Sequence, residues 1–297
     1  MADQCTFDEK LLDESFDPQD VRSYGLAILL NETSFSCSIL DFKRNKFIGL
    51  IRCIPMAVNP ADGQQTPITS FKTFLHSVSS ALPWLEGPFR MVKIAYDGKS
   101  STLVPSALFD PGELDRIYRF NFSLNPGEVV FADHLMPLDA WQVYAVSESI
   151  LEPARTLFPK NKIVHSTSLL IESVWINYKN RINTPHVFLN VREHLFDLMV
   201  FDGHQMVFFN TFPFQNPDDV AYYLIFMMEQ LNFNPEITPL ILLGSVDIGD
   251  ALSDLLHRYV RNTTTGRRNE AYRYSYILNQ LPPQACFSLL NFFSCGL

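Results

Sequence analysis

The sequence has 297 residues, of which 47% are hydrophobic and 19% are charged, so it is long enough for one large globular domain or two of ordinary size. It contains no run near the roughly 18 apolar residues that a membrane-spanning helix requires, and its start is acidic where a secretory or transit peptide would be basic. The net charge of −9 disfavours nucleic acid as a partner. Together these features predict a cytoplasmic protein without a membrane span.

The cysteine pattern predicts reduced thiols. The five cysteines are scattered along the chain and include no Cys-x-x-Cys pair, so neither a disulfide framework nor a zinc site is indicated. Acidic residues and histidines do gather between residues 193 and 204. Strand alternation would place Glu193 and His194 on opposite faces, so we expect no metal site there either.

The first 20 residues form an acidic arm, with seven acidic residues against Lys10 alone. Four apolar side chains interrupt it: Phe7, Leu11, Leu12 and Phe16. The arm is compatible with a disordered tail, a partner-binding segment or an edge element of a sheet. We favour a solvated lead-in that joins the fold near Leu11, and we expect removal of residues 1–10 to leave the fold intact.

Five arginines stand within sixteen residues near the other end, opposed by Glu270 only: Arg258, Arg261, Arg267, Arg268 and Arg273. The segment between them, residues 262–266, is typical of a polar loop. The cluster could bind an anion or receive the acidic arm. A solvated surface is the simpler interpretation, because charges around a loop usually face water.

The first half of the chain predicts three strands, a helix and a fourth strand. The strands are expected at residues 26–30, 35–41, 47–53 and 91–95, the last closed by Asp97 and Gly98. Apolar residues at helical spacing mark one helix face before the fourth strand: Phe71, Phe74, Leu75, Val78 and Leu82. This half therefore has the order β-β-β-α-β.

The second half predicts the same order. Strands are expected at residues 186–190, 195–201, 205–212 and 239–243. The helix before the last strand begins at Asn216 and Pro217, an N-cap followed by proline in the first turn, and its apolar body covers residues 220–231. A repeated order of elements indicates an internal duplication.

The duplication divides the chain into two units. Residues 91–162 and the amphipathic stretch 167–178 form a connecting segment with structure of its own, which we interpret as an inserted subdomain. A polar stretch closed by Pro185 follows it. We therefore predict a first half at residues 1–182, with the acidic arm and the insertion, and a second half at residues 183–297.

A duplicated β-β-β-α-β core with a helix between the copies resembles the actin-like ATPase fold, which is ribonuclease H-like. The likeness is best to its bacterial pilus-assembly and cell-division members, and more narrowly to an uncharacterised bacterial family of unknown function assigned this fold. That resemblance implies an α/β protein with a nucleotide site between the halves. In such relatives the first turn of each half carries an Asp-x-Gly motif. Its backbone approaches the nucleotide phosphates, and its acidic side chain positions the metal ion and water.

The resemblance implies ten nucleotide-binding positions, none of them catalytic: Asn31, Glu32, Thr33, Ser34, Asn190, Arg192, Glu193, Asp197, Gly244 and Ser245. Leu30 and Glu32 replace the acid and the glycine of the first motif. Asp197 keeps an acid of the second turn, and Gly244 and Ser245 resemble the turn that contacts adenosine.

ATP with magnesium is possible at these positions but disfavoured. Phosphoryl transfer needs the phosphate charge to be neutralised, normally by a metal that carboxylates hold. Glu32 and Glu193 add negative charge, although Arg192 could offset it, and the side chains of Glu32 and Arg192 fill space that relatives reserve for glycine. We predict a non-catalytic or weakly nucleotide-binding protein that acts as a binding or scaffold component for a protein partner. The alternative is an ATPase or kinase-like switch with unorthodox phosphate loops.

Overall fold

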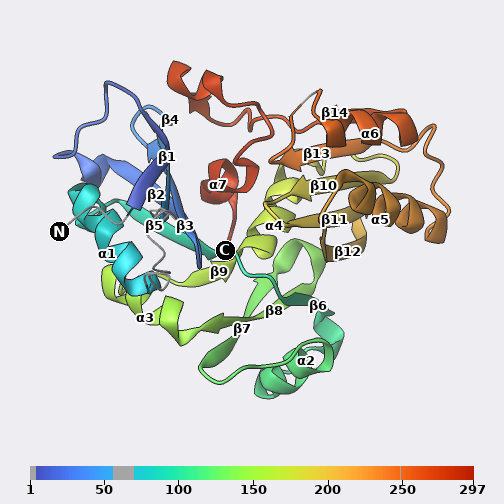
Figure 1. The fold of residues 1–297 in the computed structure, drawn as a ribbon, viewed down its shortest axis with the longest axis horizontal. Helices are drawn as coiled ribbons and strands as arrows, with labels where there is room; N and C mark the ends of the chain where they lie inside the picture. The colour runs from blue at the N-terminus through green and yellow to red at the C-terminus, as the bar shows by residue number, and fades with distance from the viewer. Residues whose placement is uncertain (1–4, 56–69, 248) are drawn as a thin grey trace, which may run out of the picture.

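The computed structural model describes residues 5–55, 70–247 and 249–297. It is an α/β structure with three sheets, two of which face each other across a central pair of helices, α4 (Ser166–Tyr178) and α7 (Phe287–Asn291) (Figure 1). Within the described ranges, no helix is long and apolar enough to cross a bilayer.

The first sheet is built from the N-terminal half. Its strands lie in the order β1-β4-β3-β2-β5-β9, and the two-residue strand β15 (Arg273–Tyr274) also pairs with β4. The neighbours of β2 are antiparallel β3 and parallel β5. The bounds are β1 Cys5–Leu12, β2 Tyr24–Asn31, β3 Ser34–Asp41, β4 Lys46–Pro55, β5 Met91–Tyr96 and β9 Ile163–His165.

Helices α1 (Phe71–Ala81) and α3 (Glu148–Leu157) pack on this sheet. The side chain of Ser70 caps α1 by accepting from the backbone N–H of Thr73, which satisfies one of the free donors of the first turn. The apolar face that the sequence predicts is buried, with Phe74 and Val78 wholly out of solvent. Burial of that face fixes α1 against the strands, because removing apolar surface from water is the main stabilising term.

The second sheet has the order β12-β11-β10-β13-β14. Its bounds are β10 His186–Val191, β11 Leu195–Asp202, β12 Gln205–Pro213, β13 Leu240–Gly244 and β14 Thr263–Thr265. Two helices cover one face, α5 (Pro217–Gln230) and α6 (Ala251–Tyr259). A reciprocal capping box of Asn216 and Asp219 starts α5 where the sequence predicts it.

The two sheets share one topology. In each, the first three strands form an antiparallel meander, a helix follows, and the next strand lies parallel beside the first, as β4-β3-β2-β5 and β12-β11-β10-β13. The predicted β-β-β-α-β order is therefore confirmed in both halves, and the fold class with it. The inserted subdomain contains the third sheet, β6-β8-β7, with β6 Ser101–Pro105, β7 Glu128–Leu135, β8 Ala140–Ser147 and helix α2 Leu114–Asn121.

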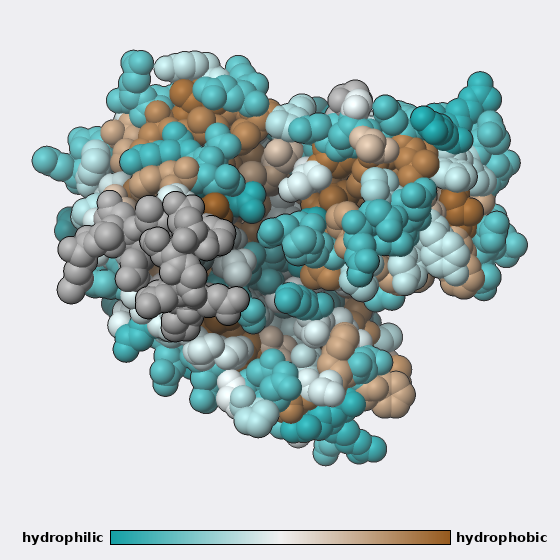
Figure 2. Space-filling model, viewed as in Figure 1, coloured by the Kyte–Doolittle hydropathy of each residue, from teal (hydrophilic) through white to brown (hydrophobic). Residues whose placement is uncertain are grey.

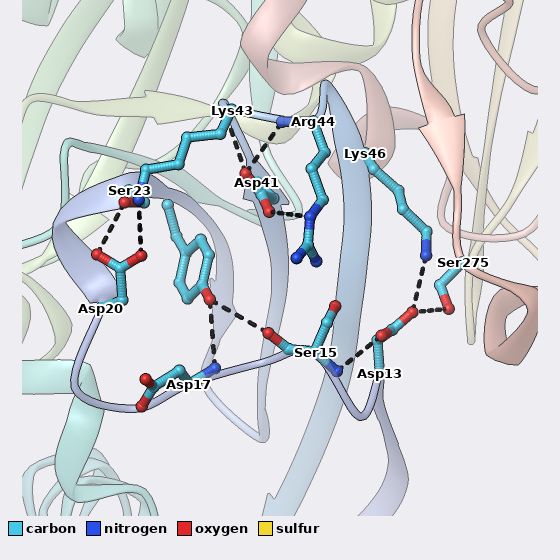
Figure 3. Close-up of polar contacts among 11 residues, drawn as sticks. Asp13, Ser15, Asp17, Asp20, Ser23, Asp41, Lys43, Arg44, Lys46 and Ser275 are labelled. Carbon is cyan, nitrogen blue, oxygen red and sulfur yellow. Dashed lines mark hydrogen bonds and ion pairs between the residues drawn. The ribbon is translucent and has the colours of Figure 1, made fainter.

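The N-terminal arm differs from the expectation of a solvated lead-in. It is an edge strand from Cys5 onward, paired antiparallel with β4, and the side chains of Cys5 and Leu11 are buried. Three acids of residues 5–20 pair close to the first sheet: Asp13 with Lys46 and Ser275, and Asp20 with Lys43 (Figure 3), and Asp8 with Arg52. The arginine cluster of residues 258–273 therefore does not receive these carboxylates, because cations of β4 and of the turn before it stand nearer.

Candidate functional site

A polar site forms at the carboxyl ends of three strands, two from the first sheet and one from the second. Asp97 comes directly after β5, Ser166 directly after β9, and Arg192 directly after β10. The carboxyl ends of strands in open α/β sheets are the usual place for binding sites. In the space-filling view the molecule is hollowed between its two lobes, and hydrophilic side chains gather along this hollow (Figure 2).

Arg192 joins the two halves at this site. Its Nη1 lies 2.7 Å from Oδ1 of Asp97 and donates to the carbonyl of Gly98, and its Nη2 lies 2.8 Å from Oδ1 of Asp197. Burial would lower the pKa of Arg192, but the carboxylates of Asp197 and Asp97 raise it above its ordinary value. The guanidinium therefore stays charged and acts as a fixed cation between two carboxylates.

Asp197 is held by neighbours that the sheet register supplies. It lies opposite Asn190 in the β10–β11 pair and opposite Thr211 in the β11–β12 pair. The amide of Asn190 donates to Oδ2 at 2.9 Å and the hydroxyl of Thr211 donates to Oδ1 at 2.7 Å, so Asp197 is only 1% exposed yet fully paired. With Arg192 added, Oδ1 of Asp197 accepts two hydrogen bonds and Oδ2 accepts one, all from within the chain.

Helix α4 supplies the rest of the site from its first turn. The hydroxyl of Ser166 donates to Oδ1 of Asp97 at 2.8 Å. Beside it, burial lowers the pKa of His165 to about 3, an effect that Arg192 reinforces and Asp97 opposes. A Cβ on Gly98 would stand 2.8 Å from Nε2 of His165, so the backbone approaches the imidazole too closely for a side chain at that position.

The first predicted turn makes its own local contacts. Oδ1 of Asn31 accepts from the backbone N–H of Thr33 at 2.8 Å, which closes the hairpin between β2 and β3. Glu32 and Thr33 are exposed, and Asn31 and Ser34 are half-buried. The turn does stand near Asp97, because the Asp97 N–H donates to the carbonyl of Leu30 at 2.6 Å.

The other predicted residues divide into two sets. Gly244 and Ser245 lie against β10: the Ser245 N–H donates to the carbonyl of Val191, and Gly244 has φ +79° with no room for a Cβ, which would stand 2.2 Å from that same oxygen. Glu193 is exposed and turned toward the exposed ring of His194, 3.8 Å away. The structure thus brings Asn190, Arg192, Asp197, Gly244 and Ser245 together and leaves Glu193 outside.

These residues do not fit ATP with magnesium. A divalent cation would need carboxylate oxygens, and Arg192 already pairs with Oδ1 of both Asp97 and Asp197. Two carboxylates against one guanidinium leave a net negative charge, which opposes a polyphosphate. No step of phosphoryl transfer follows from this arrangement. Within the described ranges no group of three or more His, Cys, Asp or Glu side chains is placed to hold a metal ion.

Sequence reasoning did not find Asp97, Ser166 and Thr211 as parts of the site. Asp97 was expected only to close a strand, and the other two are small hydroxyl residues without a motif. One signal was present for Asp97, since an acid directly after a buried parallel strand stands at the edge where sites form. Thr211 could be found only from the register of β12 against β11.

Comparison with solved structures supports the actin-like architecture. A protein of Bacteroides thetaiotaomicron with an actin-like ATPase fold and unknown function is 20% identical, with a TM-score of 0.75 over 94% of this chain and 99% of that chain. The PilM–PilN type IV pilus biogenesis complex is 11% identical, with a TM-score of 0.54 over 91% of this chain and 97% of that chain. At such identities the likeness shows the fold alone, and it confirms the predicted one. No curated protein matches the sequence.

A family model described as "Protein of unknown function (DUF3822)" matches residues 13–263. The match includes both meanders, the inserted subdomain and every residue of the polar site. This chain, with its actin-like fold and its arginine between two carboxylates, therefore belongs to the DUF3822 family of proteins of unknown function.

Proposed function

We propose that this protein is a non-catalytic actin-like component that binds a protein partner and serves as a scaffold in the bacterial cytoplasm. Arg192 carries the proposal, because its charge satisfies Asp97 and Asp197 inside the chain. A nucleotide would have to break both ion pairs before it gained any contact there. Taking the paired cation away from these largely buried carboxylates costs several kcal/mol, and that cost disfavours nucleotide binding.

Two further observations support a partner-binding role in a reducing compartment. Cys37, Cys53, Cys286 and Cys295 are free thiols, and all but Cys286 are buried, which is usual for cytoplasmic proteins. The similarly folded PilM occurs in a complex with PilN, so this architecture can serve in an assembly of proteins. The partner of this chain has to be found by experiment.

Titration calorimetry with ATP and magnesium tests the nucleotide part of the proposal. We expect the wild-type protein to bind no more tightly than about 1 mM, or roughly −4 kcal/mol. Arg192→Met removes the internal cation, and Arg116→Met is a matched control because Arg116 is 84% exposed. A micromolar dissociation constant for the wild-type protein would contradict the proposal and favour the nucleotide-dependent switch.

Affinity capture tests the partner-binding part. The tagged protein is incubated with lysate, with and without ATP and magnesium, and the recovered proteins are identified by mass spectrometry. We expect the same partner under both conditions, because Arg192 is satisfied within the chain. Recovery that depends strictly on nucleotide would assign the protein to the switch class instead.

A further inference from the structure

The second sheet ends in an edge strand with unpaired backbone groups. Among the described residues, β14 pairs with β13 alone, at the end of the sheet (Figure 1). On either side of the paired residues, the carbonyl of Asn262 accepts from the N–H of Leu240 and the N–H of Gly266 donates to the carbonyl of Leu242. Successive residues of a strand direct their backbone bonds to opposite sides. Thr263 and Thr265 therefore direct their N–H and C=O groups away from β13, and Thr263 is buried whereas Thr265 is partly exposed. Thr265 thus offers one donor and one acceptor to an added strand.

A groove runs along this edge. It has a volume of 660 Å³, and one wall comes from β14 and the residues after it, while the other comes from the loop at residues 279–283. The loop wall is held in place by Arg268, whose Nη2 donates to the carbonyls of Leu278 and Leu281. The guanidinium of Arg268 also stands over the ring of Tyr274, 5.1 Å from its centroid. An extended chain segment could lie between the two walls.

The groove is positively charged. Arg267 and Arg268 both line it, and no carboxylate does. Arg267 is exposed, and in the described part of the chain no acid lies within ion-pair distance of it. A cation free of intramolecular pairing beside an open strand edge is suited to an acidic strand, since backbone bonds give affinity and side-chain charges give specificity.

The acids of this chain that could compete are engaged elsewhere. In the N-terminal segment, Asp8, Asp13 and Asp20 pair with cations of β4 or of the turn before it, and Glu270 pairs with Arg181 at 3.1 Å. Glu236 is 3.5 Å from Arg261, which does not line the groove. The occupant is therefore best supplied by another protein.

We infer that this groove docks an extended, acidic segment of a protein partner, which adds as a strand to the outer edge of β14 and places a carboxylate on Arg267. The inference rests on the proposed role as a partner-binding protein and names a surface and a partner chemistry for it. It does not depend on the polar site at Arg192, which lies at the end of β10.

Fluorescence anisotropy tests the inference with an eight-residue peptide of alternating glutamate and valine that carries fluorescein. We expect saturable binding to the full-length protein, weakened as sodium chloride rises from about 50 to about 300 mM. A peptide with lysine in place of glutamate should not bind. Arg267→Glu should weaken binding at least about tenfold, whereas Arg258→Glu, an exposed arginine of α6 outside the groove, should change it less than about twofold.

A second pair of variants tests the strand geometry separately from charge. Thr265→Pro removes the outward N–H and should abolish binding, whereas Thr265→Val keeps that N–H and should bind like the wild type. Circular dichroism melts show whether each variant is folded. Absent binding of the acidic peptide, equal binding of the lysine peptide, or equal effects of Arg267→Glu and Arg258→Glu would overturn the inference.

Two combinations of results distinguish a failure of the groove inference from a failure of the proposed non-catalytic role. Tight ATP binding without peptide binding would overturn both the groove and the non-catalytic role, whereas absent peptide binding with absent ATP binding would overturn the groove alone. Light scattering provides a further check. A concentration-dependent dimer that Arg267→Glu dissolves would assign the groove to a second copy of this chain and would also overturn the inference.

Discussion

Arg192 follows β10 directly, and its side chain decides the character of the site. From the sequence we expected it to offset the charge of Glu32 and Glu193. Its partners are instead Asp97 and Asp197, at 2.7 and 2.8 Å. Glu193 is turned to solvent. The charges that lie in contact at this site are therefore those of Arg192, Asp97 and Asp197, and not those of the exposed acids.

His165 gives this site a pH dependence that can be measured. Burial lowers its pKa in the folded protein to about 3, with help from Arg192 and against Asp97, whereas an unfolded histidine titrates near 6.5. Between these two pH values His165 is protonated in the unfolded chain and neutral in the folded protein. The contribution of the neutral imidazole to the free energy of unfolding is therefore complete above about pH 6.5. It is lost toward pH 3 at up to about 1.4 kcal/mol per pH unit.

We expect His165→Asn to flatten the pH dependence of stability between about pH 4.5 and 6.5, a window that lies between the folded and unfolded pKa values of His165. Urea unfolding at several pH values measures it for both proteins. His76→Asn, on the exposed side of α1, is the matched control and should follow the wild type. An unchanged slope in His165→Asn would show that the imidazole does not titrate differently on unfolding.

The charged residues of β1 explain why the sequence did not predict it as a strand. Asp8 and Lys10 put charge on its exposed positions and Glu9 is half-buried, while Cys5 and Leu11 are buried against β4 and the strands beyond it. Charged residues protect an edge strand from pairing with other molecules. The same charges remove the alternation of apolar residues by which a strand is usually found, so the sequence favoured a solvated segment.

Removing residues 1–12 should destabilise the protein, contrary to the sequence expectation for residues 1–10. The deletion uncovers the edge of β4 and the apolar surface around Leu11, and we expect the melting temperature to fall by at least about 4 °C, on the order of 2 kcal/mol. Differential scanning calorimetry measures the change. Asp8→Asn removes only a half-exposed ion pair with Arg52 and should shift the melting temperature by less than about 1 °C. Equal melting temperatures for the deletion and the wild type would restore the solvated-arm interpretation.

Across the whole molecule, the C-terminal segment connects the cores of both sheets. Leu289 and Leu290 of α7 pack with residues of the first sheet, and Phe287 packs with residues of the second. The Nζ of Lys93, in β5, donates to the carbonyl of Cys295 at 2.6 Å. The division of the chain between residues 182 and 183 stays a prediction. The C-terminal residues contact the first sheet, whichever of the two units they are assigned to.

Asn291 tests this connection. Its Oδ1 accepts from the amides of Asn177 and Asn269 at 2.7 and 2.8 Å, and its side chain is 1% exposed. Asn291→Leu keeps the volume but removes the acceptor, so we expect one cooperative transition at a lower temperature and a loss on the order of 2 kcal/mol. Calorimetry measures it, with the exposed Gln280→Leu as control. A loss no larger than that of the control would show that the amide network does not stabilise the connection.

The sequence by itself determined the duplicated order of strands and helices, because apolar runs, helical spacing and caps such as Asn216 are local signals. It also found half of the polar site, since Asn190, Arg192 and Asp197 belong to one hairpin. Only the tertiary structure decided that Arg192 reaches Asp97, that β1 joins β4 and that α7 lies between the sheets. These contacts join residues that are far apart in the chain. They depend on how far each side chain extends and on which surfaces are buried in the folded protein, and no local sequence pattern encodes either.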